Sequence, residues 1–172
     1  SQQGVYRYAN LAGKTRRRGL RDAECELADT EAFRENRYFE VLAEYAKSAP
    51  DDLLIRLTII NRGPDAAALH VLPTLWFRNT WSWGCTYDDC TVKASLKLAD
   101  SETVRACHET LGEFDFRIDP QNPAALSEWL FTENETNFQQ VFGFQSDSLY
   151  VKDAFHRRVI EDETEAVNPA HQ

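Results

Sequence analysis

The strongest constraint on the fold is an alternation of apolar and polar side chains with a period of two. Apolar side chains occupy the odd positions of the run Phe39–Tyr45, and Glu40 and Glu44 are among the side chains between them. A second run, Leu53–Ile59, has the same period. Because successive side chains of a β-strand point to opposite faces, both runs are predicted to be strands. The turn-forming residues 48–52 between them predict an antiparallel hairpin.

The same reading predicts further strands along the chain. They are expected around residues 25–27 and over residues 67–77, 92–98, 104–106, 114–118, 126–132 and 138–142. Pro73 cannot donate a ladder hydrogen bond, so a bulge or a sheet edge is expected near it. Only Leu149 to Ile160 has helical spacing. Roughly seven to nine short strands joined by short turns predict an all-β fold, an antiparallel β-sandwich with one short C-terminal helix.

Length and composition favour a single globular domain over residues 1–172. The chain is 42% hydrophobic and 12% aromatic, which is typical of a packed protein. Its net charge of −9 disfavours a nucleic-acid partner, and no apolar run is long enough to cross a bilayer. Ser1 is not a start methionine and no signal-peptide pattern follows it. We therefore expect a fragment of a longer, cytoplasmic protein, truncated at both ends.

The richest stretch for function is a tryptophan-rich segment within residues 61–84. Three of the four tryptophans, Trp76, Trp81 and Trp83, lie there within eight residues, together with Arg78 and Asn79. Flat rings cover the C–H faces of sugars while neighbouring polar groups bond the hydroxyls, so these five residues are the predicted substrate-binding set. Packing of the same rings in a core or between domains is the alternative, and the residues alone leave both interpretations open.

Carboxylate pairs are the only candidates for acid–base catalysis. Asp88 and Asp89 follow the tryptophans, and Glu133 and Glu135 lie in a second acidic stretch. A glycosidase needs two carboxylates across the scissile bond. Among 28 acidic residues, however, spacing alone selects no pair, and acidic side chains in turns are usually solvated. No catalytic residue is assigned.

No metal or cofactor site is predicted either. Cys85 and Cys90 lack the spacing and the second ligand pair of a zinc site, so free thiols are expected, with a disulfide across a turn as the alternative. His70 and His156 are interpreted as a surface residue and a structural residue. The chain also lacks the phosphate-binding, zinc-protease and serine-hydrolase motifs.

Two further features each allow an ordinary structural interpretation and a functional one. The basic residues between Lys14 and Arg21 are typical of a solvated turn or short helix, and an anion or partner contact is the alternative. Asn134-Glu-Thr136 matches a glycosylation sequon, which matters only in a secreted eukaryotic protein.

Seven motifs in a consistent order carry a resemblance to a known family. They are Arg34–Lys47, Asp52–Arg56, Asn61–Pro64, Leu72–Gly84, Thr132–Phe138, Tyr150–His156 and Ala166–Pro169. In this order the chain resembles the N-terminal part of bacterial glucosidase-like proteins of glycoside hydrolase family 63. The match is weakest around residues 85–125, which include Asp88, Asp89 and the Cys85/Cys90 pair.

The resemblance implies a parent with two parts. An N-terminal β-sandwich of the supersandwich kind precedes a helical (α/α) toroid that carries both catalytic carboxylates and inverts the anomeric carbon. This chain resembles the sandwich alone, so no catalytic residue is carried over. The expected function is that of a non-catalytic domain that packs on the toroid of the same parent chain and shapes its site for α-glucosides or related oligosaccharides. A carbohydrate-binding module and a purely structural or dimer-forming sandwich are the alternatives.

Overall fold

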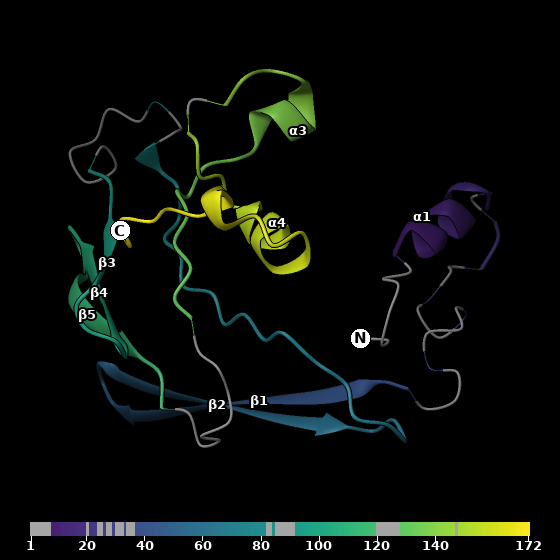
Figure 1. The fold of residues 1–172 in the computed structure, drawn as a ribbon, viewed down its shortest axis with the longest axis horizontal. Coiled ribbons are helices and arrows are strands. Elements are labelled where there is room, and N and C mark those ends of the chain that lie inside the picture. Colours follow the sequence, from purple (N-terminus) through teal and green to yellow (C-terminus); the bar gives the residue numbers. More distant parts are fainter. Residues whose placement is uncertain are drawn as a thin grey trace. The chain divides into compact units, whose positions relative to one another are not determined.

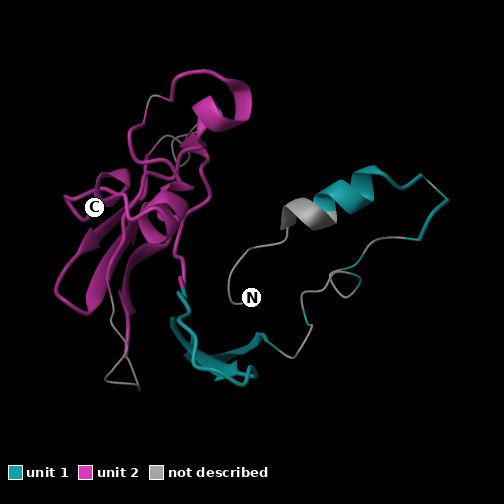
Figure 2. Cartoon of the chain, turned by 45° about the vertical axis from the view of Figure 1, so that its right-hand side comes forward, with its two compact units in different colours: residues 1–71 teal, residues 72–172 magenta. Residues whose placement is uncertain are grey.

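The chain divides into two units, residues 1–71 and residues 72–172 (Figure 2). A computed structural model describes residues 8–19, 21–23, 26, 29, 33, 37–81, 84, 92–119, 128–146 and 148–172. Each unit contains one antiparallel sheet, and a few short helices accompany the strands. The chain is therefore β-rich, as the alternation predicted. No helix in the described ranges combines the length and hydropathy needed to span a membrane.

The first unit contains helix α1 (Tyr8–Arg16) and a two-stranded sheet of β1 (Phe39–Ala49) and β2 (Asp52–Asn61) (Figure 1). The predicted hairpin is confirmed, but its loop is shorter than predicted because β1 continues to Ala49 and leaves only residues 50–51 between the strands. Helix α1 includes the start of the basic run. Its last turn contains Lys14 and Arg16. Their positive charges interact favourably with the partial negative charge at the C-terminus of a helix.

The register of the hairpin gives it two chemically different faces. Val41 lies opposite Ile59 and Tyr45 lies opposite Ile55, so one face is apolar. On the other face Glu44 pairs with Arg56 at 3.0 Å. The apolar face is nevertheless exposed: Tyr45 retains 71% of its accessible surface. No residue of the first unit whose burial is described, from Ala12 onward, is buried.

The second unit is built on a three-stranded sheet of β3 (Ser95–Leu98), β4 (Thr103–His108) and β5 (Gly112–Arg117), in that order (Figure 1). Gly112, with φ of 79°, adopts the left-handed conformation that the tight β4–β5 turn requires. The strands predicted at 104–106 and 114–118 are confirmed. The strand predicted over 92–98 begins later, at Ser95.

One face of this sheet forms the core of the second unit. Val104 and Ala106 on β4 are 3% and 4% exposed. Segments from elsewhere in the same unit cover that face: the Phe77 ring packs on His108 at 5.1 Å, and the Trp129 ring meets Phe116 edge-on at 5.8 Å. Burial of these apolar side chains is the main stabilising contribution that the fold provides here.

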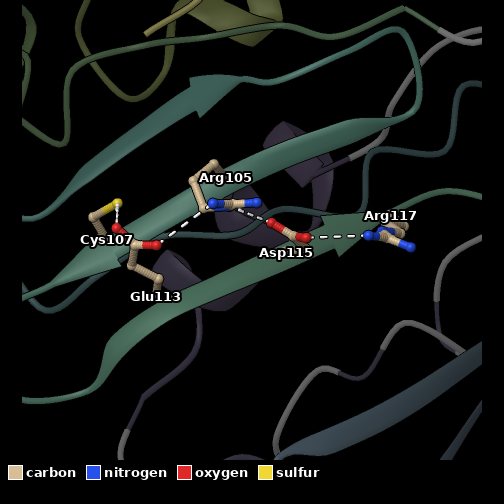
Figure 3. Close-up of polar contacts among 5 residues, drawn as sticks. All are labelled: Arg105, Cys107, Glu113, Asp115 and Arg117. Atoms are coloured by element: carbon tan, nitrogen blue, oxygen red, sulfur yellow. Dashed lines mark hydrogen bonds and ion pairs between the residues drawn. The ribbon is translucent and has the colours of Figure 1, made fainter.

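The other face carries a line of charged side chains on β4 and β5 (Figure 3). Arg105 bonds Asp115 and approaches Glu113 at 3.5 Å, while Arg117 reaches Asp115 at 3.1 Å. The hydrogen bond from Arg105 is the main reason why the pKa of Asp115 is lowered, and Arg117 adds to the effect. At one end of the line, the Cys107 thiol lies 3.8 Å from Glu113.

Three short helical elements follow the sheet: α3 (Phe138–Phe142), α4 (Ala154–Ile160) and the 3-10 helix η4 (Thr164–Ala166). The strand predicted at 138–142 is wrong because local capping favours a helix. Asn137 accepts a hydrogen bond from the Gln140 amide at 3.0 Å, and Gly143 ends the helix in the left-handed conformation with φ of 76°. The C-terminal helix begins at Ala154, five residues later than predicted.

Two other predicted strands are also wrong. Residues 66–80 contain no helix or strand, although residues 67–77 alternate. Pro73 removes one ladder donor, and Thr74 Oγ1 donates to the Leu72 carbonyl at 3.1 Å instead of leaving that oxygen for a neighbouring strand. Residues 128–132 are likewise outside any strand. The strand expected around Cys25 and Leu27 falls outside the described residues.

Candidate functional site

The candidate site is organised by two short segments of the second unit that lie side by side without forming a regular strand pair. The Glu133 amide donates to the Tyr150 carbonyl at 2.6 Å, and the Lys152 amide donates to the Glu135 carbonyl at 3.0 Å. These two bonds fix residues 133–135 against residues 150–152. The side chains of Glu133 and Glu135 are thereby held on a segment whose position is defined by its backbone.

The Glu135 carboxylate connects this segment to the tryptophan-rich stretch. Trp81 donates its indole N–H to Glu135 Oε1 at 3.0 Å. Asn79 donates from Nδ2 to Glu135 Oε2 at 3.2 Å and to the Asn134 carbonyl at 2.6 Å. One carboxylate therefore holds two residues that precede it by 54 and 56 positions. These charge-assisted bonds lie in a part-buried place, where they are stronger than on the open surface.

Asn134 adds a further hydrogen bond between the same two segments. Its Nδ2 donates to the Phe77 carbonyl, while its Oδ1 is buried without a protein partner. The amide nitrogen of the sequon is therefore engaged inside the second unit. A glycan at Asn134 would be attached to this same nitrogen, beside the Phe77 carbonyl.

Lys93 supplies the positive charge of the site. Its ammonium lies 3.5 Å from Glu133 Oε2 and 3.8 Å from Glu135 Oε1. The same nitrogen is 5.9 Å from the centre of the Trp81 ring, in cation–π range. Lys93 thus offsets one of the two negative charges and lies over the Trp81 ring, which is among the predicted sugar-binding residues.

The predicted substrate-binding residues are brought together only in part. Asn79 and Trp81 meet at Glu135, and Trp76 lies under the Lys152 ammonium at 5.5 Å. Trp76 is 65% exposed, whereas Trp81 is half-buried. Arg78 is exposed. Trp83 lies outside the described residues, and so do Asp88, Asp89, Cys85 and Cys90.

A cavity of about 570 Å³ adjoins the two glutamates. It is lined by Lys93, Glu133, Glu135, Thr136, Phe138, Gln145, Ser146, Ser148, Leu149 and Tyr150. Sequence reasoning named the glutamates only as weak catalytic candidates and missed Lys93 and the two serines. No local motif marks these residues, because their proximity arises from contacts between distant segments.

The remaining candidates do not join this site. His70 and His156 are exposed. His156 donates its backbone amide to the Asp153 carbonyl at 3.1 Å in the first turn of α4. Cys107 is a free thiol. Within the described ranges no three His, Cys, Asp or Glu side chains come together as metal ligands would.

Comparison with known proteins finds a relative in yeast. The chain is 31% identical, over 198 aligned residues, to the Saccharomyces cerevisiae protein named "Uncharacterized protein YMR196W". The alignment includes 98% of this chain but only 18% of the yeast protein. No protein-family model matches the sequence, and no solved structure matches it. The chain is therefore similar to a small part of a much longer eukaryotic protein.

Proposed function

We propose that this chain is a non-catalytic β-sandwich domain of a glycoside hydrolase that acts on α-glucosides or related oligosaccharides. In this proposal it is the N-terminal sandwich of a family 63-like parent, and it packs on a downstream (α/α) toroid. The tryptophan-rich stretch then forms one wall of the substrate site.

The observation that carries the proposal is the convergence at Glu135. Three of the motifs on which the family resemblance rests, Leu72–Gly84, Thr132–Phe138 and Tyr150–His156, are far apart in the sequence. Glu135 bonds the first through Trp81 and Asn79, and its carbonyl bonds the third through Lys152. A shared site gives a physical reason why these three segments would be retained together.

The sandwich architecture is supported by the two sheets. Each has one mostly apolar face and carries ion pairs on the other, as a layer of a sandwich does. A two-stranded hairpin such as β1–β2 is marginal by itself, so its apolar side chains would be stabilised by a further layer. We propose that such a layer exists in the longer protein.

The non-catalytic role is supported by the way the carboxylates are engaged. Glu135 accepts hydrogen bonds on both oxygens, and Glu133 is ion-paired with Lys93. A general acid must hold a proton and deliver it to the leaving oxygen. A carboxylate whose oxygens already meet the Trp81 indole, the Asn79 amide and the Lys93 ammonium suits a positioning role instead.

Hydrolysis assays test this proposal. We expect the 172-residue chain to release no product from aryl α-glucosides or maltooligosaccharides, whereas a chain extended through the downstream region should be active. In the extended protein Trp81→Ala should lower kcat/KM by about tenfold or more if the wall contacts substrate. Turnover by the 172-residue chain that is abolished by one Asp or Glu substitution would refute the non-catalytic role.

A carbohydrate-binding module remains the second candidate, and the exposure of Trp76 favours it. An exposed tryptophan ring provides a platform for a sugar without any catalytic group. Titration of tryptophan fluorescence with maltose tests this candidate. Two results together would favour the module over the hydrolase domain. Maltose would bind with millimolar or tighter affinity that Trp76→Ala removes, and the chain extended through the downstream region would show no hydrolysis.

A further inference from the structure

The cavity beside Glu133 and Glu135 has features that define a class of ligand. Its volume of about 570 Å³ lies within the range of roughly 300–1,000 Å³ that is usual for small-molecule sites. Two short segments of the chain, from Glu133 to Phe138 and around Ser146 and Ser148, contribute lining residues together with Lys93. All of these belong to the second unit, so the cavity is formed within one body.

Two serine hydroxyls in the wall lack protein partners. Ser146 Oγ and Ser148 Oγ are buried, and neither forms a hydrogen bond with any residue that the structure describes. Buried polar atoms are normally paired, and a hydroxyl both donates and accepts. Because both serines line the cavity, a polar molecule inside it is the natural partner.

The charge of the described wall disfavours an anionic ligand. Glu133 and Glu135 contribute two negative charges and Lys93 contributes one positive charge, so these three leave a net charge of −1. The Lys93 ammonium is already within 4 Å of both carboxylates. A phosphate or carboxylate ligand would therefore meet repulsion that no free cation of the described lining offsets.

We infer that this cavity binds a neutral sugar, of one or two rings. Carboxylate oxygens accept hydrogen bonds from sugar hydroxyls, and the serine hydroxyls both donate and accept. Phe138, 43% exposed, offers an apolar surface for the C–H face of a ring. The inference deepens the proposed function and rests on it only for the choice of α-glucosides as probes. The cavity lies beside Trp81, whose indole N–H donates to the lining residue Glu135.

Equilibrium titration with maltose and methyl α-D-glucoside, followed by calorimetry or by NMR chemical shifts, tests the inference on the full chain. We expect saturable binding, weakened about 3- to 10-fold for each hydroxyl lost in Ser146→Ala and Ser148→Ala. Ser95→Ala, on the exposed polar face of β3, is the matched control and should bind as the unchanged protein does. Glucose 6-phosphate should bind at least about tenfold more weakly than methyl α-D-glucoside.

Glu133→Gln provides a second route if a serine variant fails to fold, because this side chain is 42% exposed and its amide keeps the shape. It should relax the discrimination against glucose 6-phosphate. Absence of saturable sugar binding, or equal affinity in the double serine variant, would overturn the inference. Sugar binding can be measured independently of hydrolysis. Binding to the cavity without any hydrolysis by the extended protein would refute only the hydrolase proposal. Hydrolysis without binding to this cavity sinks only the present inference.

Discussion

The β1–β2 hairpin and the β3–β4–β5 sheet resemble each other in the side chains on their faces but differ in how far their apolar faces are buried. Both are antiparallel, and both place apolar side chains on one face and ion pairs on the other. Yet Val104 in β4 is 3% exposed, whereas Ile55 in β2 is 52% exposed. Alternation therefore specifies which face is apolar, while coverage of that face depends on segments that only the tertiary fold supplies.

The covering segments explain the difference. In the second unit, Phe77 and Trp129 pack against the sheet, and Leu98 donates its amide to the His171 carbonyl at 3.0 Å. The chain thus returns to both β3 and the apolar face within residues 72–172. The hairpin receives no comparable cover from the residues of its own unit whose burial is described, since none of them is buried.

The largest effect is expected from a core substitution in the second unit. Phe131 is 6% exposed and stacks on His171 at 5.6 Å, so Phe131→Ala should lower the free energy of unfolding by about 3–5 kcal/mol. Phe114→Ala, on the 43% exposed ring of β5, is the matched control and should cost clearly less. Chemical denaturation measures both. Equal losses would show that the two rings are equally buried in solution.

An intermediate effect is expected at Glu135. Glu135→Ala leaves the Trp81 indole and the Asn79 amide without their carboxylate partner, which should cost about 1–3 kcal/mol. Glu133→Ala is the comparison variant. Its ion-pair partner, Lys93, is 55% exposed, so this substitution should lower the free energy of unfolding by less than Glu135→Ala does. Urea denaturation with tryptophan fluorescence follows the loss. Equal losses of unfolding free energy in the two variants would show that Glu135 does not link the two segments.

A small effect is expected on the apolar face of the hairpin. Leu53 is 68% exposed, so Leu53→Lys should change the free energy of unfolding of this chain by no more than about 0.5 kcal/mol. In a longer protein that covers the face, the same change would bury a charge and cost several-fold more. Thermal unfolding of both lengths makes the comparison. A large loss in the short chain would mean that the face is already covered there.

The smallest effect is expected from the charged face of the second sheet. The hydrogen bond from Arg105 lowers the pKa of Asp115 below its ordinary 3.8, so its stabilisation is present above about pH 4 and is lost as the pH falls through the lowered value. Asp115→Asn should therefore lower Tm slightly at pH 7, and the difference from the unchanged protein should vanish at the acidic end of a pH series in low salt. An offset that persists undiminished at pH 2 would assign the loss to packing rather than charge.

The sequence by itself determined the strands whose pattern is strong and local. Alternation and a turn located the hairpin, β4 and β5, and the helical spacing located α4, because these signals act over a few residues. It failed where local capping or proline overrode the pattern. Asn137 and Gly143 make a helix of residues 138–142, and Pro73 together with Thr74 keeps residues 67–77 out of a ladder.

Only the tertiary structure decided the site. Composition predicted a sugar-binding set of five residues, Trp76, Arg78, Asn79, Trp81 and Trp83. Nothing local indicated that Glu135 would bond two of them, Asn79 and Trp81, across more than fifty residues. Nor did the sequence indicate that Lys93, Ser146 and Ser148 would line a common cavity. Composition shows which groups are available, whereas hydrogen bonds between distant segments determine which are already satisfied and which can still meet a ligand.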